Sequence, residues 1–321
     1  MNKVLVVFGV SVFLLLLILV FGPRVKVGAV SAPQVPHGDL DAYLARAEGR
    51  YDDIIKGVEK RIVWADASLK GKTEYAVVYI HGFGASSPET RPFADRVAER
   101  LGANLFFTRL SGHGRTSEAF SKSKAAEWLS DGLEAYEIGK RLGDKVVVIG
   151  GSTGATVGLW VAERLGEGAL EALVMMSPNF GPKDARAEWL NAPWAKQVLP
   201  QVLGDSYSWS SENEVAMKYC ISSYRVDVIF EMMALVRRVR GLDLGKVNTS
   251  VLCFYSMNDI VVDQSKTIRV LRRLGGKRVE AIEVRDASDP KNHVLMGDIW
   301  PSENLDWMVE KAVGFVGCDE G

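Results

Sequence analysis

The sequence predicts an α/β fold in which a mostly parallel sheet is covered by helices on both faces. Two observations predict it. Apolar strand-like runs alternate with amphipathic helical patterns along most of the chain, which is the order that builds a parallel sheet. Within this alternation, residues 150–154 join a strand to a helix through the pattern Gly-x-Ser-x-Gly. The 321 residues fit one large domain with small additions.

The chain begins with an uninterrupted apolar run over residues 4–21. This length is at the lower end for a helix that spans a bilayer, and it exceeds the core of most cleaved signal peptides. We therefore expect residues 1–22 to be a single-pass transmembrane anchor, with a cleaved signal peptide and secretion as the alternative. In both cases the rest of the chain is expected to be extracytoplasmic, although the nearly balanced flanking charges do not set an orientation.

Residues 23–37 contain Pro23, Pro33 and Pro36 and read as a linker, so the main domain is expected over residues 38–321. A helix begins near Asp39, and residues 62–64 are a candidate edge strand. Strands are then expected at 74–80, 104–108, 145–149 and 170–176, with helices at 91–101, 124–142 and 155–165.

Residues 178–247 interrupt the alternation and carry three tryptophans, Trp189, Trp194 and Trp209. We expect a helical cap here, including a helix at 226–239 whose apolar face forms an acyl pocket. The alternative is that these are ordinary helices that pack on the core, because aromatic-rich stripes are usually core. The alternation then resumes, with strands expected at 251–256 and 279–284 and a helix at 264–274.

The Gly-x-Ser-x-Gly pattern at 150–154 predicts a nucleophile elbow. Ser152 would occupy a sharp, strained turn that projects its hydroxyl from the sheet, and the flanking glycines would allow close passage of strand and helix. A glycine-rich turn with an incidental serine would match the same pattern, so the surrounding sequence has to support it.

Two further polar residues follow predicted strands. Asp259 comes after the strand at 251–256, and His293 comes after the strand at 279–284. A serine hydroxyl needs a base within hydrogen-bond reach, and an acid orients that base. The chain order Ser152, Asp259, His293 is the order in which nucleophile-elbow enzymes carry their triad. The active edge of a parallel sheet lies where the strands end, so the three are expected to meet there.

Other titratable residues compete for these roles. We expect His81 to fix its own loop, His113 to brace the elbow or the pocket, and Asp263 to cap the helix at 264–274. Asp286 and Asp289 are expected to be surface carboxylates. The segment His81-Gly82-Phe83 follows a buried strand, so the amides of Phe83 and Thr153 are the expected oxyanion-hole donors.

On these motifs the chain resembles serine hydrolases of the α/β-hydrolase fold, close to bacterial carboxylesterases and to the monoacylglycerol-lipase-like and serine aminopeptidase-like groups. The resemblance covers about residues 73–316, and the segments that carry it are 81–85, 110–114, 150–154, 258–262 and 292–293. It implies hydrolysis of small-molecule carboxylic esters, either lipid-like or of short to medium acyl length, through an acyl-enzyme and without a cofactor. Aminopeptidase, acyltransferase and non-catalytic binding activities on the same fold remain alternatives. No acidic cluster for a free amino terminus is evident, which favours esters.

The composition excludes several other classes. The formal net charge is −1 and the basic residues are scattered, so a nucleic-acid partner is not expected. Three cysteines give no disulfide framework, and no Cys or His cluster has the spacing of metal ligands. No metal is therefore expected. The membrane is expected as a partner through the N-terminal segment, and the oligomeric state is left open.

Overall fold

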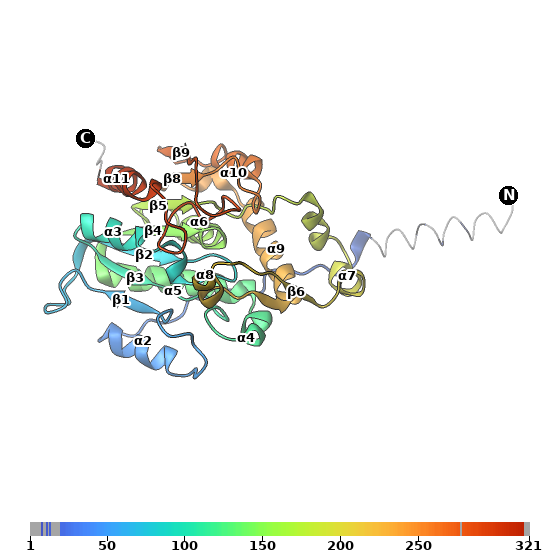
Figure 1. Cartoon of the computed structure of the whole chain (residues 1–321), viewed down its shortest axis with the longest axis horizontal. Coiled ribbons are helices and arrows are strands. Elements are labelled where there is room, and N and C mark those ends of the chain that lie inside the picture. Colours follow the sequence, from blue (N-terminus) through green and yellow to red (C-terminus); the bar gives the residue numbers. More distant parts are fainter. Residues whose placement is uncertain (1–7, 9–10, 12, 14–19, 277, 318–321) are drawn as a thin grey trace.

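The computed structural model describes residues 8, 11, 13, 20–276 and 278–317. In this part of the chain the strands form a central seven-stranded sheet in the order β1-β3-β2-β4-β5-β8-β9. The first strand pairs antiparallel to β3, and every other neighbouring pair in the sheet is parallel. The predicted mostly parallel sheet is therefore confirmed, and Figure 1 shows helices on both of its sides.

The strands of this sheet are β1 (Arg61–Val63), β2 (Thr73–Ile80), β3 (Asn104–Phe107), β4 (Gly143–Gly151), β5 (Ala172–Met176), β8 (Ser250–Tyr255) and β9 (Val279–Glu283). The helices outside the cap are α2 (Leu40–Glu48), η1 (Ser87–Thr90), α3 (Phe93–Arg100), α4 (Ser117–Lys122), α5 (Ala125–Leu142), α6 (Thr153–Leu165), α10 (Gln264–Leu271) and α11 (Asn304–Gly317).

The two faces of the sheet bury different helices because successive strand residues point to opposite sides. On β2, Ala76 and Val78 belong to an apolar cluster that α5 and α6 complete. Val77 and Tyr79 belong to a second cluster, which α3 and α11 complete. Burial on both faces explains why the central strands are continuous apolar runs rather than alternating ones.

Each predicted strand and helix corresponds to an observed one, with ends shifted by a few residues. The edge strand at 62–64 is β1, and Asp39 caps α2 by accepting from the amides of Asp41 and Ala42. Asp263 caps α10 as expected, accepting from the amide of Ser265 at 2.9 Å. The helix α11 was not predicted, although it closes one face of the sheet.

Between β5 and β8 the chain forms the predicted insertion. Its elements are η2 (Ala185–Asn191), α7 (Ala195–Leu203), β6 (Ser206–Ser208), α8 (Glu214–Tyr219), β7 (Ser223–Arg225), α9 (Asp227–Arg240) and η3 (Leu244–Lys246). The helix predicted at 226–239 is α9, and its apolar residues, such as Met233 and Leu235, are buried in the cluster shared with α5 and α6. For α9, the core-packing alternative is therefore the one observed.

Residues 23–37 contain no helix or strand, but they lie against the domain. The amide of Trp194 donates to the carbonyl of Pro23 at 2.9 Å, and Val27, Val30 and Val35 pack on the core. Among the described residues, no helix is long and apolar enough to cross a membrane. Most of the predicted anchor at 1–22 lies outside the described residues.

Candidate active site

Ser152 occupies the sharp turn between β4 and α6. Its φ of 47° and ψ of −113° are strained for a residue with a side chain, as a nucleophile elbow requires. Both flanking glycines are sterically necessary. A Cβ on Gly150 would stand 2.6 Å from the backbone of Ala155, and one on Gly154 would stand 2.0 Å from the carbonyl oxygen of Ile80. The geometry is thus the one predicted from the Gly-x-Ser-x-Gly pattern.

Asp259 and His293 come from loops after β8 and β9 and meet in a hydrogen bond of 2.8 Å between Nδ1 and Oδ2. Asp259 is 1% exposed, and its other oxygen accepts the amides of Val261 at 2.7 Å and Val262 at 3.0 Å. These contacts fix the carboxylate and leave Oδ2 for the imidazole. The bond at Nδ1 leaves Nε2 as the ring atom available for other partners.

The charge environment of His293 favours its cationic form. Burial lowers its pKa, but the hydrogen bond and charge of Asp259, together with the charges of Glu89 and Asp289, outweigh burial and raise the pKa above its usual value. An imidazole that takes a proton during a reaction is stabilised by such surroundings.

Ser152 and His293 line one cavity. Its other lining residues are Glu89, Thr90, Gly151, Met176, Ser177, Val294, Leu295 and Met296. The Ser152 hydroxyl makes no hydrogen bond to the His293 ring in this conformation, and such contacts are often loose in unliganded enzymes. No residue of the 178–247 insertion lines the cavity, so the acyl pocket expected on α9 is not found there.

One predicted oxyanion donor, Thr153, directly follows Ser152, and the other, Phe83, follows a glycine that lies against Ser152. Gly82, which precedes Phe83, approaches so closely that a Cβ there would stand 3.3 Å from the Cβ of Ser152. Thr153 is the first residue of α6, where amides have no intrahelical acceptor. In the part of the chain that the structure describes, the amides of Phe83 and Thr153 donate no hydrogen bond. Both donors therefore remain available to a ligand.

His81 and His113 do not approach the base position. The ring of His81 accepts the amide of Leu110 at 3.0 Å, which ties the loop after β2 to the loop after β3. The ring of His113 packs against those of Phe83, Phe120 and Trp128. Burial lowers the pKa of His81 to about 4 and places that of His113 well below its usual value. Both rings are therefore neutral. His81 fixes its own loop, as the sequence predicts, whereas His113 packs in an aromatic cluster and does not line the cavity.

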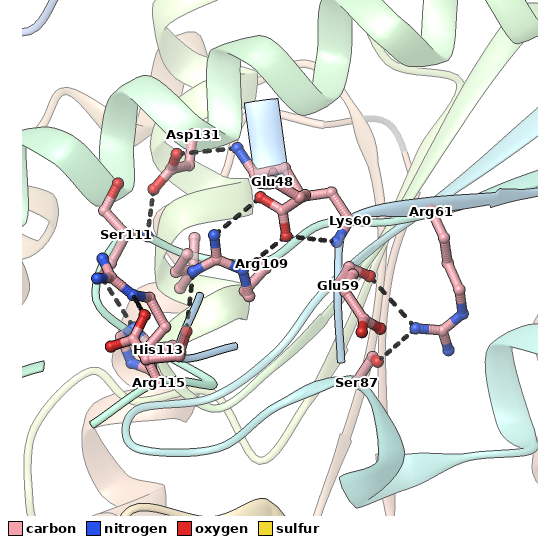
Figure 2. Close-up of polar contacts among 12 residues, drawn as sticks. Glu48, Glu59, Lys60, Arg61, Ser87, Arg109, Ser111, His113, Arg115 and Asp131 are labelled. Atoms are coloured by element: carbon pink, nitrogen blue, oxygen red, sulfur yellow. Dashed lines mark hydrogen bonds and ion pairs between the residues drawn. The ribbon is translucent and has the colours of Figure 1, made fainter. Parts of the chain in front are cut away.

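A buried ionic network holds the loop at 110–114 in place (Figure 2). The sequence alone did not predict this network. Arg109 donates to the carboxylate of Glu48 and to the carbonyl of His113. Asp131 accepts the amide of Ser111 at 2.6 Å and pairs with Lys60 at 3.3 Å. The loop at 110–114 is thus held by α2 on one side and by α5 on the other.

The prediction for Asp289 was wrong. Asp289 is 5% exposed rather than a surface carboxylate, and it accepts the amides of Lys291, His293 and Val294, each at 3.0 Å. It shapes the loop that presents the imidazole. Asp286 is exposed, as expected.

Glu89 was also missed, although its carboxylate lines the cavity with Ser152. No signal in the sequence distinguished it from a surface glutamate.

Among the described residues, no group of three His, Cys, Asp or Glu side chains could hold a metal ion.

Comparison with known proteins identifies the family of the chain. A family model described as serine aminopeptidase, S33, matches residues 71–287. The chain belongs to this hydrolase family. Over 88 residues it is 31% identical to a thermostable monoacylglycerol lipase from Bacillus sp. (strain H-257). That match covers 27% of the chain and 35% of the lipase, so the likeness is confined to part of each protein.

Solved structures share the fold over most of the chain. A structure from work on LipS and LipT, two metagenome-derived lipolytic enzymes, superposes with a TM-score of 0.66 at 18% identity, covering 82% of this chain and 98% of that one. The monoacylglycerol lipase of Paleococcus ferrophilus gives 0.58 at 16% identity, covering 80% and 99%. A monoglyceride lipase from Saccharomyces cerevisiae, in complex with a substrate analog, gives 0.59 at 12%, covering 80% and 90%.

These likenesses confirm the α/β-hydrolase fold that the sequence predicts. The chain is thus a member of the serine aminopeptidase, S33, family, and its structural relatives include lipolytic enzymes and a monoacylglycerol lipase. The roles of individual residues rest on the geometry above.

Proposed function

We propose that this protein hydrolyses carboxylic esters through an acyl-enzyme formed on Ser152. One observation carries the proposal. Ser152, strained at the elbow, and His293, hydrogen-bonded to buried Asp259, open onto the same cavity. Nucleophile, base and orienting acid are the three parts that acyl transfer needs, and they come from three separate strand ends.

In this mechanism the Ser152 oxygen attacks the ester carbonyl while Nε2 of His293 takes its proton. Asp259 holds Nδ1 and stabilises the imidazolium that forms. The amides of Phe83 and Thr153, which donate no hydrogen bond within the described residues, donate to the oxyanion. His293 then protonates the leaving alcohol, and water releases the acid from the acyl-enzyme.

The cavity favours esters with short acyl groups. The apolar face of α9 is committed to the core, and none of its residues extends the lining of the cavity beside Ser152. We expect kcat/KM to be greatest for short chains and to fall for long ones. A methylene group that is not buried against apolar side chains does not contribute the binding free energy of about 0.8 kcal/mol that burial would provide.

The test compares p-nitrophenyl esters of increasing acyl length with amino-acyl arylamides, using wild type and Ser152→Ala. Hydrolysis of esters that depends on Ser152 supports the proposal. A clear preference for the arylamides would contradict it and assign an aminopeptidase activity instead.

We also propose that residues 1–22 anchor the enzyme in a membrane with its domain outside the cytoplasm. The apolar run at 4–21 supports this location. Full-length protein should remain with membranes after carbonate extraction, and deletion of residues 1–22 should release active enzyme. If the protein expressed from the full-length sequence is instead soluble and begins near residues 29–33, residues 1–22 belong to a cleaved signal peptide.

A further inference from the structure

A carboxylate with no place in the triad lies beside the nucleophile. Glu89 belongs to η1, in the loop that follows Phe83, and lines the cavity with Ser152 and His293. Its Oε2 and the Cβ of Ser152 lie 3.4 Å and 3.3 Å from the point where a Cβ on Gly82 would stand. The carboxylate and the nucleophile therefore flank the same glycine, whose missing side chain keeps the space between them open.

The carboxylate of Glu89 has no partner among the residues that the structure describes. It makes no hydrogen bond or ion pair with any residue in the described part of the chain, and the residue is only partly exposed. The hydroxyl of the neighbouring Thr90 donates to the hydroxyl of Tyr79 at 2.6 Å, so it does not bond to Glu89. The backbone amide of Glu89 donates to the carbonyl of Ser86 at 3.1 Å. Buried polar groups are nearly always hydrogen-bonded, so an external donor is the expected partner.

The charges around Glu89 allow it to accept such a donor. Burial raises its pKa to about 7, Asp289 adds to that increase, and His293 opposes it. The ionised carboxylate is thus stabilised by the imidazole that borders the same cavity. A donor lying between the two would contact both a carboxylate and a ring nitrogen.

The size of the cavity limits what that donor can be. The space left for a water-sized molecule is about 10 Å³, which is close to the minimum for a single water. A buried water also needs two to four polar partners. Glu89 and His293 supply two of these at the nucleophile.

We propose that Glu89 positions the water that hydrolyses the acyl-enzyme. This rests on the function proposed above. The water oxygen attacks the acyl carbonyl carbon, and one of its protons passes to Nε2 of His293. Glu89 accepts a hydrogen bond from the second O–H and takes no proton. The bond from the carbonyl carbon to Ser152 Oγ then breaks, His293 returns the proton to Oγ, and the acid leaves.

Glu89 then acts as a positioning residue for deacylation and not for acylation, in which no water takes part. The test is Glu89→Gln, which keeps the shape of the side chain, removes a buried charge and should not lower the melting temperature. With p-nitrophenyl acetate, kcat should fall by about 10- to 100-fold, as expected when a reacting group loses its orientation. KM should fall with it, leaving kcat/KM within about threefold of wild type.

Two further measurements follow the intermediate itself. Stopped-flow release of p-nitrophenol should show a burst in Glu89→Gln, and the mass of the quenched protein should show accumulated acetyl adduct. Glu118→Gln is the matched control, since Glu118 is an exposed carboxylate paired with Lys122 on α4. It should behave as wild type in both measurements.

Three results would overturn the proposal. Equal losses in kcat and kcat/KM would indicate a role in acylation or in folding. A wild-type rate of deacylation in Glu89→Gln would remove the positioning role. A loss confined to amino-acyl esters would make Glu89 a site for the substrate ammonium. Ser152→Ala distinguishes failure of this proposal from failure of the proposed function. If wild-type protein forms no adduct that depends on Ser152, the proposed function is contradicted, and the role of Glu89 is contradicted with it. If the adduct forms but Glu89→Gln deacylates at the wild-type rate, only the role of Glu89 is contradicted.

Discussion

Glu48 and Arg109 form a bidentate ion pair in the interior of the protein. Arg109 Nε lies 2.8 Å from Glu48 Oε2, and Arg109 Nη2 lies 2.8 Å from Glu48 Oε1. Arg109 also donates to the carbonyl of His113 at 3.0 Å, so α2 is tied to the loop after β3. Through the bond between Leu110 and His81, that loop contacts the segment carrying Phe83. Residues before the family match at 71–287 thus support the expected oxyanion hole.

Breaking this pair should be costly. Glu48→Gln leaves the Arg109 guanidinium, which is 3% exposed as a residue, without a full countercharge. We expect the free energy of unfolding to fall by about 3–5 kcal/mol, the usual penalty for removing one partner of a buried pair. Urea unfolding measures it.

Glu118→Gln serves as the control for that measurement, because its pair with Lys122 is exposed to solvent and should contribute little to stability. A loss in Glu48→Gln no larger than in this control would show that the network of Figure 2 does not stabilise the fold.

Two nearby carboxylates should differ sharply in their effect on turnover. Asp259→Asn should lower kcat by about 10⁴ with the fold intact, because the imidazole loses its orienting acceptor. Asp263→Asn should leave kcat unchanged, since Asp263 caps α10 and asparagine caps nearly as well. Steady-state kinetics of both variants on one ester provide the comparison. The opposite ranking would assign the orienting role to Asp263.

The strands and the elbow are predictable because their signals are local. Burial on both faces makes β2 and β4 continuous apolar runs, and the close approach of Gly154 to Ile80 demands a glycine at its position. Asp259 and His293 are predictable because loops after parallel strands converge at one edge of the sheet.

The residues that sequence reasoning missed depend on contacts between distant segments. Glu48 and Arg109 are separated by 61 positions, and each alone looks like an ordinary surface charge. Asp289 becomes buried because its loop folds around its carboxylate. Glu89 reaches Ser152 only because η1 turns back over Gly82. The role of α9 was ambiguous for a similar reason, since an apolar helical face looks alike whether it meets a core or a ligand.

The decrease of kcat/KM at acidic pH should reflect the protonation of the His293 imidazole. The imidazole must be neutral to accept a proton, and its pKa is raised above 6.5, so kcat/KM should increase with pH through a midpoint above 6.5. The charge of Glu89 contributes to that increase, after the hydrogen bond and charge of Asp259. Replacing Glu89 by glutamine should therefore move the midpoint to lower pH, as measured by kcat/KM between pH 5 and pH 9.

The groups that face His293 here are Asp259, Glu89 and Asp289. A midpoint that is unchanged in Glu89→Gln would show that Glu89 does not sense the charge of the imidazole. A midpoint that moves to higher pH would contradict the sign of the interaction.

The central claim is that Ser152 becomes acylated, and peptide mapping after labelling tests it most directly. Protein treated with a fluorophosphonate probe should carry one adduct, on the peptide that contains Ser152, and Ser152→Ala should carry none. The variant should also lose ester hydrolysis by about 10⁴-fold or more, as expected for a missing triad nucleophile. An adduct on another residue, or a variant that keeps more than about a tenth of the activity, would contradict the account.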